Sequence, residues 1–181
     1  VMTISFQIAH GIHNVNQIKI TIPEGQNNSE VANTISEKLP EFDVSNFLSQ
    51  AKFSEGYLFP ETYYFYASAT IEDVISSMKQ MFKRKTDGLF DNMSESEIKK
   101  VLTLASLVER EAQGTDDRAL IAGILTKRLS LKMPLQVDAT VAYANGVEEK
   151  DLVKSHFKLE SPYNTYVVLG LPPSPIANPG L

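Results

Sequence analysis

The sequence contains no cysteine. This absence excludes disulfide bonds, thiolate catalysis and zinc sites with cysteine ligands. No apolar run reaches the ~18 residues that a bilayer-spanning helix requires, and the first residues lack the charged-then-apolar pattern of a signal peptide. Basic residues are also outnumbered by acidic ones, with a formal net charge of -5 and a pI of about 5.2. Since no stripe of Lys and Arg can release counterions from phosphates, we expect no nucleic-acid partner.

The composition is that of a folded globular protein, with 43% hydrophobic and 22% charged residues. A length of 181 residues allows one ordinary domain, or one domain with a small companion. The sequence begins abruptly on VMTISFQ and ends on NPGL. These ends lead us to expect that the sequence is part of a longer chain, and they leave open whether a membrane anchor precedes it.

Hydrophobic spacing predicts an α+β fold. Ile18, Ile20 and Ile22 alternate with polar residues before Pro23, which is typical of a strand. Residues 1–11 fit either a strand or a helix end, and the aromatic-rich residues 55–70 fit loop and extended chain. Four-residue spacing and capping signals predict helices over residues 27–39, 43–51, 70–85, 94–113 and 115–131. We expect a small βα subdomain over residues 1–50 and a mostly helical subdomain over residues 51–181.

The helix over residues 94–113 carries two glutamates in an unusual place. At about 100° per residue, its apolar side chains form one broad arc, with Arg110 on the opposite side. Glu109 and Glu111 both fall inside this arc. Such a carboxyl can be a half-buried general acid with a raised pKa, or it can pair with a cation such as Arg118 or Arg128. Spacing alone favours the ion pair.

A resemblance covers nearly the whole chain. EGYLFPETY, LASLVEREA, LIAGILTKRLSLKMPLQVDATVAY, SPYNTY and GLPPSPIANPG, in this order, resemble the endolytic murein transglycosylases, the YceG-like family. ITIPEG and the helix after it resemble the LysM-like element that precedes the catalytic part of that family. The family continues beyond the NPG at which this chain stops, and many members have proline where DAT has Ala139.

The resemblance implies a lytic transglycosylase that cuts the β-1,4 bond between N-acetylmuramic acid and N-acetylglucosamine in peptidoglycan strands. Glu109 matches the catalytic acid, and Glu111 matches a supporting acidic position. The C6 hydroxyl of the cleaved muramic acid is the nucleophile, so that 1,6-anhydro ends form and neither metal nor organic cofactor is needed. The implied setting is the outer face of the bacterial cytoplasmic membrane, with cell-wall synthases as possible partners.

Other candidate residues each have a structural alternative. Tyr57 can stack on a sugar or fill the core, and Glu61 can contact substrate or accept backbone hydrogen bonds in its loop. Gln136 suits an N-acetyl group, whereas Asp138 is as well explained as a helix N-cap. Three residues of SPYNTY are substrate contacts by resemblance or simply turn residues: Tyr163, Asn164 and Thr165.

Two other functions remain open from the sequence. A hydrolytic muramidase would use Glu111 or Glu61 as its second carboxylate, and a non-catalytic module would bind peptidoglycan without cutting it. His10 and His13 have the spacing of a metal pair, but neither they nor His156 come with a further ligand signal, so we expect no metal site.

Overall fold

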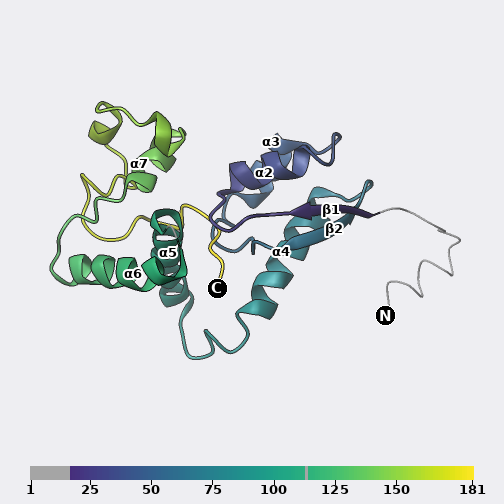
Figure 1. Cartoon of the computed structure of the whole chain (residues 1–181). Helices are drawn as coiled ribbons and strands as arrows, with labels where there is room; N and C mark the ends of the chain where they lie inside the picture. The colour runs from purple at the N-terminus through teal and green to yellow at the C-terminus, as the bar shows by residue number, and fades with distance from the viewer. Residues whose placement is uncertain (1–16, 113) are drawn as a thin grey trace, which may run out of the picture.

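The computed structural model describes residues 17–112 and 114–181 and confirms an α+β fold (Figure 1). The expectations for residues 1–11, His10 and His13 lie outside the described residues. No helix among the described residues is long and apolar enough to cross a membrane. The elements in chain order are β1 (Gln17–Thr21), α2 (Asn28–Ser36), α3 (Val44–Ala51), β2 (Thr62–Tyr66), α4 (Ile71–Lys85), α5 (Glu95–Glu111), α6 (Thr115–Ser130), α7 (Asp138–Asn145), and the 3-10 turns η1 (Glu149–Asp151) and η2 (His156–Lys158).

Local capping signals explain where most helices begin. The side chain of Thr70 accepts a hydrogen bond from Asp73 N at the start of α4, and Ser94 does the same for Glu97 N at the start of α5. Both capping boxes are predicted by the sequence and confirmed. Asp138 is a correction, because it is the first residue of α7 and no side chain caps that helix. Its carboxylate instead accepts a hydrogen bond from the Tyr166 hydroxyl at 2.6 Å.

The first hydrophobic core lies beneath a two-stranded antiparallel sheet. β1 pairs with β2, with Ile18 opposite Phe65 and Ile20 opposite Tyr63. These side chains pack on one face of the sheet against apolar residues of α2, α3 and α4. The strand β2 lies within residues 55–70, where loop and extended chain are expected, and its aromatic side chains alternate between buried and exposed positions.

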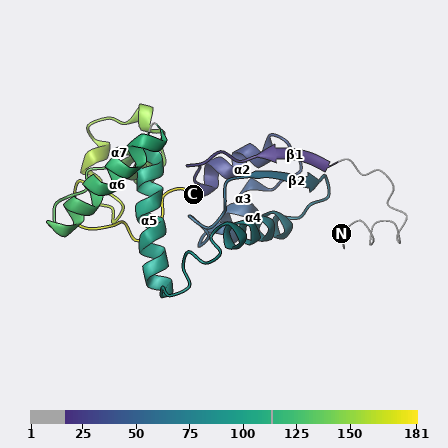
Figure 2. The same cartoon turned by 60° about the horizontal axis from the view of Figure 1, so that its bottom comes forward.

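The second core joins the end of α5 to α6, α7 and the C-terminal segment. Its buried members include Leu107, Leu125, Val137 and Ile176. The helix α5 stands between this group and the first one, and the C-terminal segment runs beside it (Figures 1 and 2). The packing thus divides the described chain after α4, beyond the boundary expected near residue 50, because β2 and α4 complete the core that β1 and α2 begin. The LysM-like character of the front stays a prediction.

Candidate active site

Glu109 lies where three distant segments meet at the end of α5. Its Oε1 accepts a hydrogen bond from Arg118 Nη2 at 2.8 Å, and its Oε2 accepts one from Gly180 N at 3.2 Å. The turn before α2 passes so close that a side chain at Gly25 would contact Glu109 Cγ at 3.4 Å. Only 10% of the Glu109 side chain is exposed. Both carboxylate oxygens are therefore engaged within the protein, and the expected ion pair with Arg118 is confirmed.

Arg118 makes a limited set of contacts. The same Nη2 atom also donates to Glu24 Oε2 at 2.7 Å, while its buried Nε has no hydrogen-bond partner in the described part of the chain. The side chain is 30% exposed. Such a single-atom contact lacks the two parallel hydrogen bonds of a bidentate arginine–carboxylate pair. Arg118 can therefore leave Glu109 without breaking a second bond to it.

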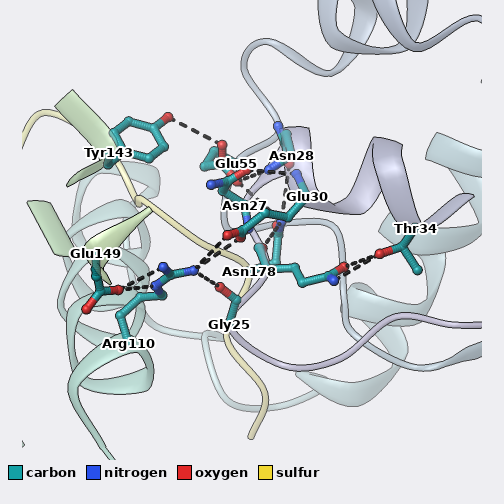
Figure 3. A network of polar contacts seen from close by, with 11 residues as sticks. Gly25, Asn27, Asn28, Glu30, Thr34, Glu55, Arg110, Tyr143, Glu149 and Asn178 are labelled. Carbon is teal, nitrogen blue, oxygen red and sulfur yellow. Dashed lines mark hydrogen bonds and ion pairs between the residues drawn. The ribbon is translucent and has the colours of Figure 1, made fainter. Parts of the chain in front are cut away.

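Arg110 is a central residue that the helical wheel places on the solvent side. Its Nη1 donates to Gly25 O at 3.1 Å and to both oxygens of Glu30, while Nε and Nη2 donate to Glu149 Oε1 (Figure 3). Arg110 thus joins the turn before α2 and α2 itself to η1. The wheel misses this role because α5 contacts protein on more than one side.

Glu111 lies at the edge of the buried face, since the residue as a whole is exposed while its carboxyl lies against the protein. It is exposed at the start of α7, where the backbone N–H groups of Asp138 and Ala139 donate to it. The protein atoms around the carboxyl, and then the charges of Glu149 and Asp138, raise its pKa. Glu111 is therefore close to Asp138 and faces the start of α7.

Glu55, rather than Glu109, has the buried surroundings and the raised pKa that the sequence analysis considers for a general acid. Its Oε1 accepts from Asn28 N at 2.9 Å and from Asn178 Nδ2 at 3.3 Å, and its Oε2 accepts from the Tyr143 hydroxyl at 3.3 Å (Figure 3). Burial raises its pKa to about 7, against the lowering effect of these hydrogen bonds, with further repulsion from Glu30. The motif EGYLFPETY contains this residue, but its partners are too distant in sequence for a local pattern to identify.

Two cavities flank Glu55. One, of about 770 Å³, is bordered by Tyr57, Phe82 and Tyr163 together with Lys52, Lys79 and Lys99. The other, of about 510 Å³, lies between α2 and α7 and includes Glu30, Arg110 and Tyr143 in its wall. Glu55 borders both. Tyr57 and Tyr163 are thus beside a cavity, as substrate contacts would have to be.

The remaining predicted contacts have structural partners instead. Asn164 is fully buried, and its Nδ2 donates to Phe157 O and Leu159 O. Thr165 is also fully buried, and its Oγ1 accepts from Val137 N. Neither borders the two cavities in this arrangement.

Glu61 and Gln136 also lie outside these cavities. Glu61 accepts from Thr62 N at 3.0 Å and pairs with Lys85 at 3.0 Å, and these contacts lower its pKa. This geometry confirms the backbone-accepting alternative for Glu61. Gln136 is exposed and accepts from Arg128 at 3.3 Å. His156 accepts from Val153 N, and no group of residues in the described chain has the arrangement of a metal site.

The sequence of the chain matches a known protein family. The model of the YceG-like family matches residues 2–181. The chain is 34% identical to an endolytic murein transglycosylase of Bacillus subtilis, over 90% of this chain and 53% of that protein. It is 32% identical to one of Streptococcus pneumoniae, over 90% of this chain and 36% of that protein.

A solved structure shares the fold. The crystal structure of a YceG-like protein from Listeria monocytogenes superposes with a TM-score of 0.81 at 30% identity, covering 98% of this chain and 68% of that one. The chain thus spans about half of the Bacillus relative and about a third of the Streptococcus relative. The matched family model extends over nearly every residue, and the chain therefore belongs to the YceG-like family.

Proposed function

We propose that the protein is an endolytic lytic transglycosylase, which cleaves the β-1,4 bond between N-acetylmuramic acid and N-acetylglucosamine within peptidoglycan strands. The observation that carries this proposal is the convergence of separate segments on Glu109. Arg118 of α6 and Gly180 of the closing NPG contact this carboxyl, and Gly25 of ITIPEG passes close to the Cγ of the same side chain. The relatives named endolytic murein transglycosylases support the same activity.

In the proposed reaction, Glu109 acts first as an acid and then as a base. It donates its proton to the glycosidic oxygen, which leaves with the N-acetylglucosamine part of the strand. The C6 hydroxyl of the muramic acid attacks C1 of the same sugar, and Glu109 takes the hydroxyl proton. A 1,6-anhydro ring forms without a water molecule. The tethered nucleophile explains how one carboxyl can serve both steps.

Substrate binding has to free one oxygen of Glu109. Arg118 is the contact that can move, because it holds Glu109 through a single nitrogen on a partly exposed side chain. The other contact comes from the backbone of Gly180. We therefore place the glycosidic oxygen at Oε1, in the position that Arg118 occupies. Glu111 would support the site through α7 rather than by contact with the reacting bond.

The proposed setting is the bacterial cell envelope, at the outer face of the cytoplasmic membrane. An N-terminal anchor outside this sequence would hold the protein there. Nascent glycan strands are the proposed substrate, and cell-wall synthases are the proposed partners because they produce these strands. The acidic net charge is consistent with a carbohydrate rather than a nucleic acid as ligand.

The test is digestion of purified peptidoglycan followed by mass spectrometry of the products. We expect anhydro-muramic ends, which are lighter by one water than reducing ends. Glu109→Gln should lower the rate by a factor on the order of 10² to 10⁴ while glycan binding is kept. Glu37→Gln, an exposed control at the end of α2, should cut like the parent protein. Reducing ends alone would establish a hydrolytic muramidase, and glycan binding without any product would establish a binding module.

A further inference from the structure

The cavity of about 510 Å³ is lined by groups that suit a neutral, hydroxyl-rich ligand. The helix α2 and its N-cap contribute the amides of Asn27 and Asn33 and the exposed hydroxyl of Ser29, and α7 contributes the Tyr143 ring. The volume is in the range of small-ligand pockets, which combine apolar walls with a few polar groups. Arg110 and Glu30 in the same wall are already paired with each other, so that their charges are balanced within the protein.

Glu55 presents one incompletely bonded oxygen to this region. Its Oε1 is occupied by Asn28 N and Asn178 Nδ2, whereas Oε2 has only the long 3.3 Å contact with the Tyr143 hydroxyl. Among the described residues, no lysine or arginine forms a salt bridge with this carboxyl. An oxygen with spare acceptor capacity at a cavity wall is available to a ligand.

The cavity is also close to the proposed catalytic carboxyl. Arg110 lies in the cavity wall and directly follows Glu109 on α5. Asn178, which holds Glu55, is two residues before Gly180, which holds Glu109. The same short C-terminal segment therefore contacts both carboxyls.

We propose that this cavity is a saccharide subsite, in which Glu55 Oε2 accepts a hydrogen bond from a hydroxyl or acetamido N–H of the bound glycan. The inference rests on the proposed function for the identity of the ligand. It assigns to Glu55 a substrate-contacting role separate from the proton transfers of Glu109. Neutral Asn and Ser side chains and the Tyr143 ring would complete the recognition of the sugar.

The contact should depend on pH, since an ionised carboxylate is the stronger acceptor. The pKa of Glu55, raised to about 7, places this change between pH 6 and pH 8. The other titratable or charged groups around the two cavities are Glu30, Arg110, Tyr143 and Glu148 on one side, and Lys52, Tyr57, Lys79, Glu95, Lys99 and Tyr163 on the other. Of these, Glu30 and Tyr143 act directly on the pKa of Glu55.

The experiment measures binding of peptide-free glycan strands to the Glu109→Gln protein by calorimetry. We expect the affinity to rise roughly fivefold from pH 6 to pH 8, as the ionised form of Glu55 binds better. Adding Glu55→Gln should remove this dependence and lower the affinity at pH 8 about tenfold. Adding Glu37→Gln should change neither quantity. If the affinity still depends on pH in the protein that carries Glu55→Gln, another group causes the dependence and the role of Glu55 is purely structural.

A second variant keeps the test decisive if Glu55→Gln does not fold. Ser29→Trp fills the cavity from an exposed position on α2 and leaves the Glu55 hydrogen bonds intact, so glycan binding should fall at least about tenfold. Unchanged affinity in both variants would overturn the subsite. Cleavage by the parent protein and by Glu55→Gln alone separates the two proposals. If both cleave strands with equal KM, the proposed subsite is wrong and the proposed transglycosylase activity is kept. If the parent protein never cleaves strands but binds them through Glu55, the proposed activity is wrong and the proposed subsite is kept.

Discussion

Glu109 and Glu55 are both held by the last residues of the chain, but their surroundings differ. Glu109 has a cation at 2.8 Å and a backbone N–H, so that both oxygens are engaged. Glu55 has only neutral donors, and burial raises its pKa to about 7. The comparison separates two uses of a buried carboxyl. The first is held by an ion pair with a partly exposed arginine, while the second has a pKa raised to about 7 and borders two cavities.

The largest effect on stability should come from replacing Asn178, the residue of the C-terminal segment that contacts Glu55. Asn178 is fully buried, and its Oδ1 accepts from Gly56 N and Leu58 N while its Nδ2 donates to Gln26 O. Asn178→Ala leaves these groups without partners, and we expect the free energy of unfolding to fall by about 4 kcal/mol. Urea unfolding measures it, with the exposed Asn92→Ala as control. A loss below about 1 kcal/mol would show that the last residues do not hold this side.

The next effect tests how closely the C-terminal segment approaches the loop after α3. Gly56 has φ +86°, and a Cβ there would lie 2.6 Å from Pro175 Cγ. Gly88 has a similar φ of +77° but nothing within 4 Å of its Cβ position. Gly56→Ala should therefore lower the free energy of unfolding by about 3 kcal/mol and Gly88→Ala by about 1 kcal/mol. Equal losses would mean that backbone strain alone matters and that the segment can retreat.

A third effect, on the order of 2 kcal/mol, concerns the pH dependence of stability. Because the pKa of Glu55 is raised from 4.5 to about 7 on folding, the folded protein binds more protons than the unfolded chain between these values. The contribution of Glu55 is thus fully present below pH 4.5 and is lost as the pH rises toward 7. Urea unfolding from pH 4.5 to 7.5 should show this loss in the parent protein and not in Glu55→Gln. Parallel curves for the two proteins would place Glu55 in an environment like that of water.

Local signals in the sequence predicted much of the fold. The capping pairs Thr70 with Asp73 and Ser94 with Glu97 start α4 and α5 as expected, because every contact in them spans three residues. The extended chain at β2 was predicted without its pairing, since its partner β1 lies more than 40 residues earlier. Pairing over that distance leaves no trace in the aromatic segment apart from its alternation.

The site could be predicted only where its contacts are close in sequence. The pairing of Glu109 with Arg118 joins consecutive helices and was expected from their order. The role of Arg110 depends on Glu30, 80 residues away, and the hydrogen bonds of Glu55 reach Tyr143 and Asn178, 88 and 123 residues away. These contacts join two separately packed groups, and the C-terminal segment takes part in one of them through Asn178. No periodicity within one helix contains that information.

The smallest expected effect decides whether Glu109 can be released for catalysis. We expect the free energies of unfolding in a double-mutant cycle of Glu109→Gln and Arg118→Gln to give a coupling energy of about 1 kcal/mol. The reason is that the arginine is partly exposed and contacts one oxygen. The coupling should weaken in about 1 M salt, where screening acts over about 3 Å. A coupling of this size costs a bound glycan roughly a fivefold loss in affinity when it displaces Arg118. If the cycle instead gave about 4 kcal/mol, displacement would cost about a thousandfold, and Glu109 would be a structural residue rather than the catalytic acid.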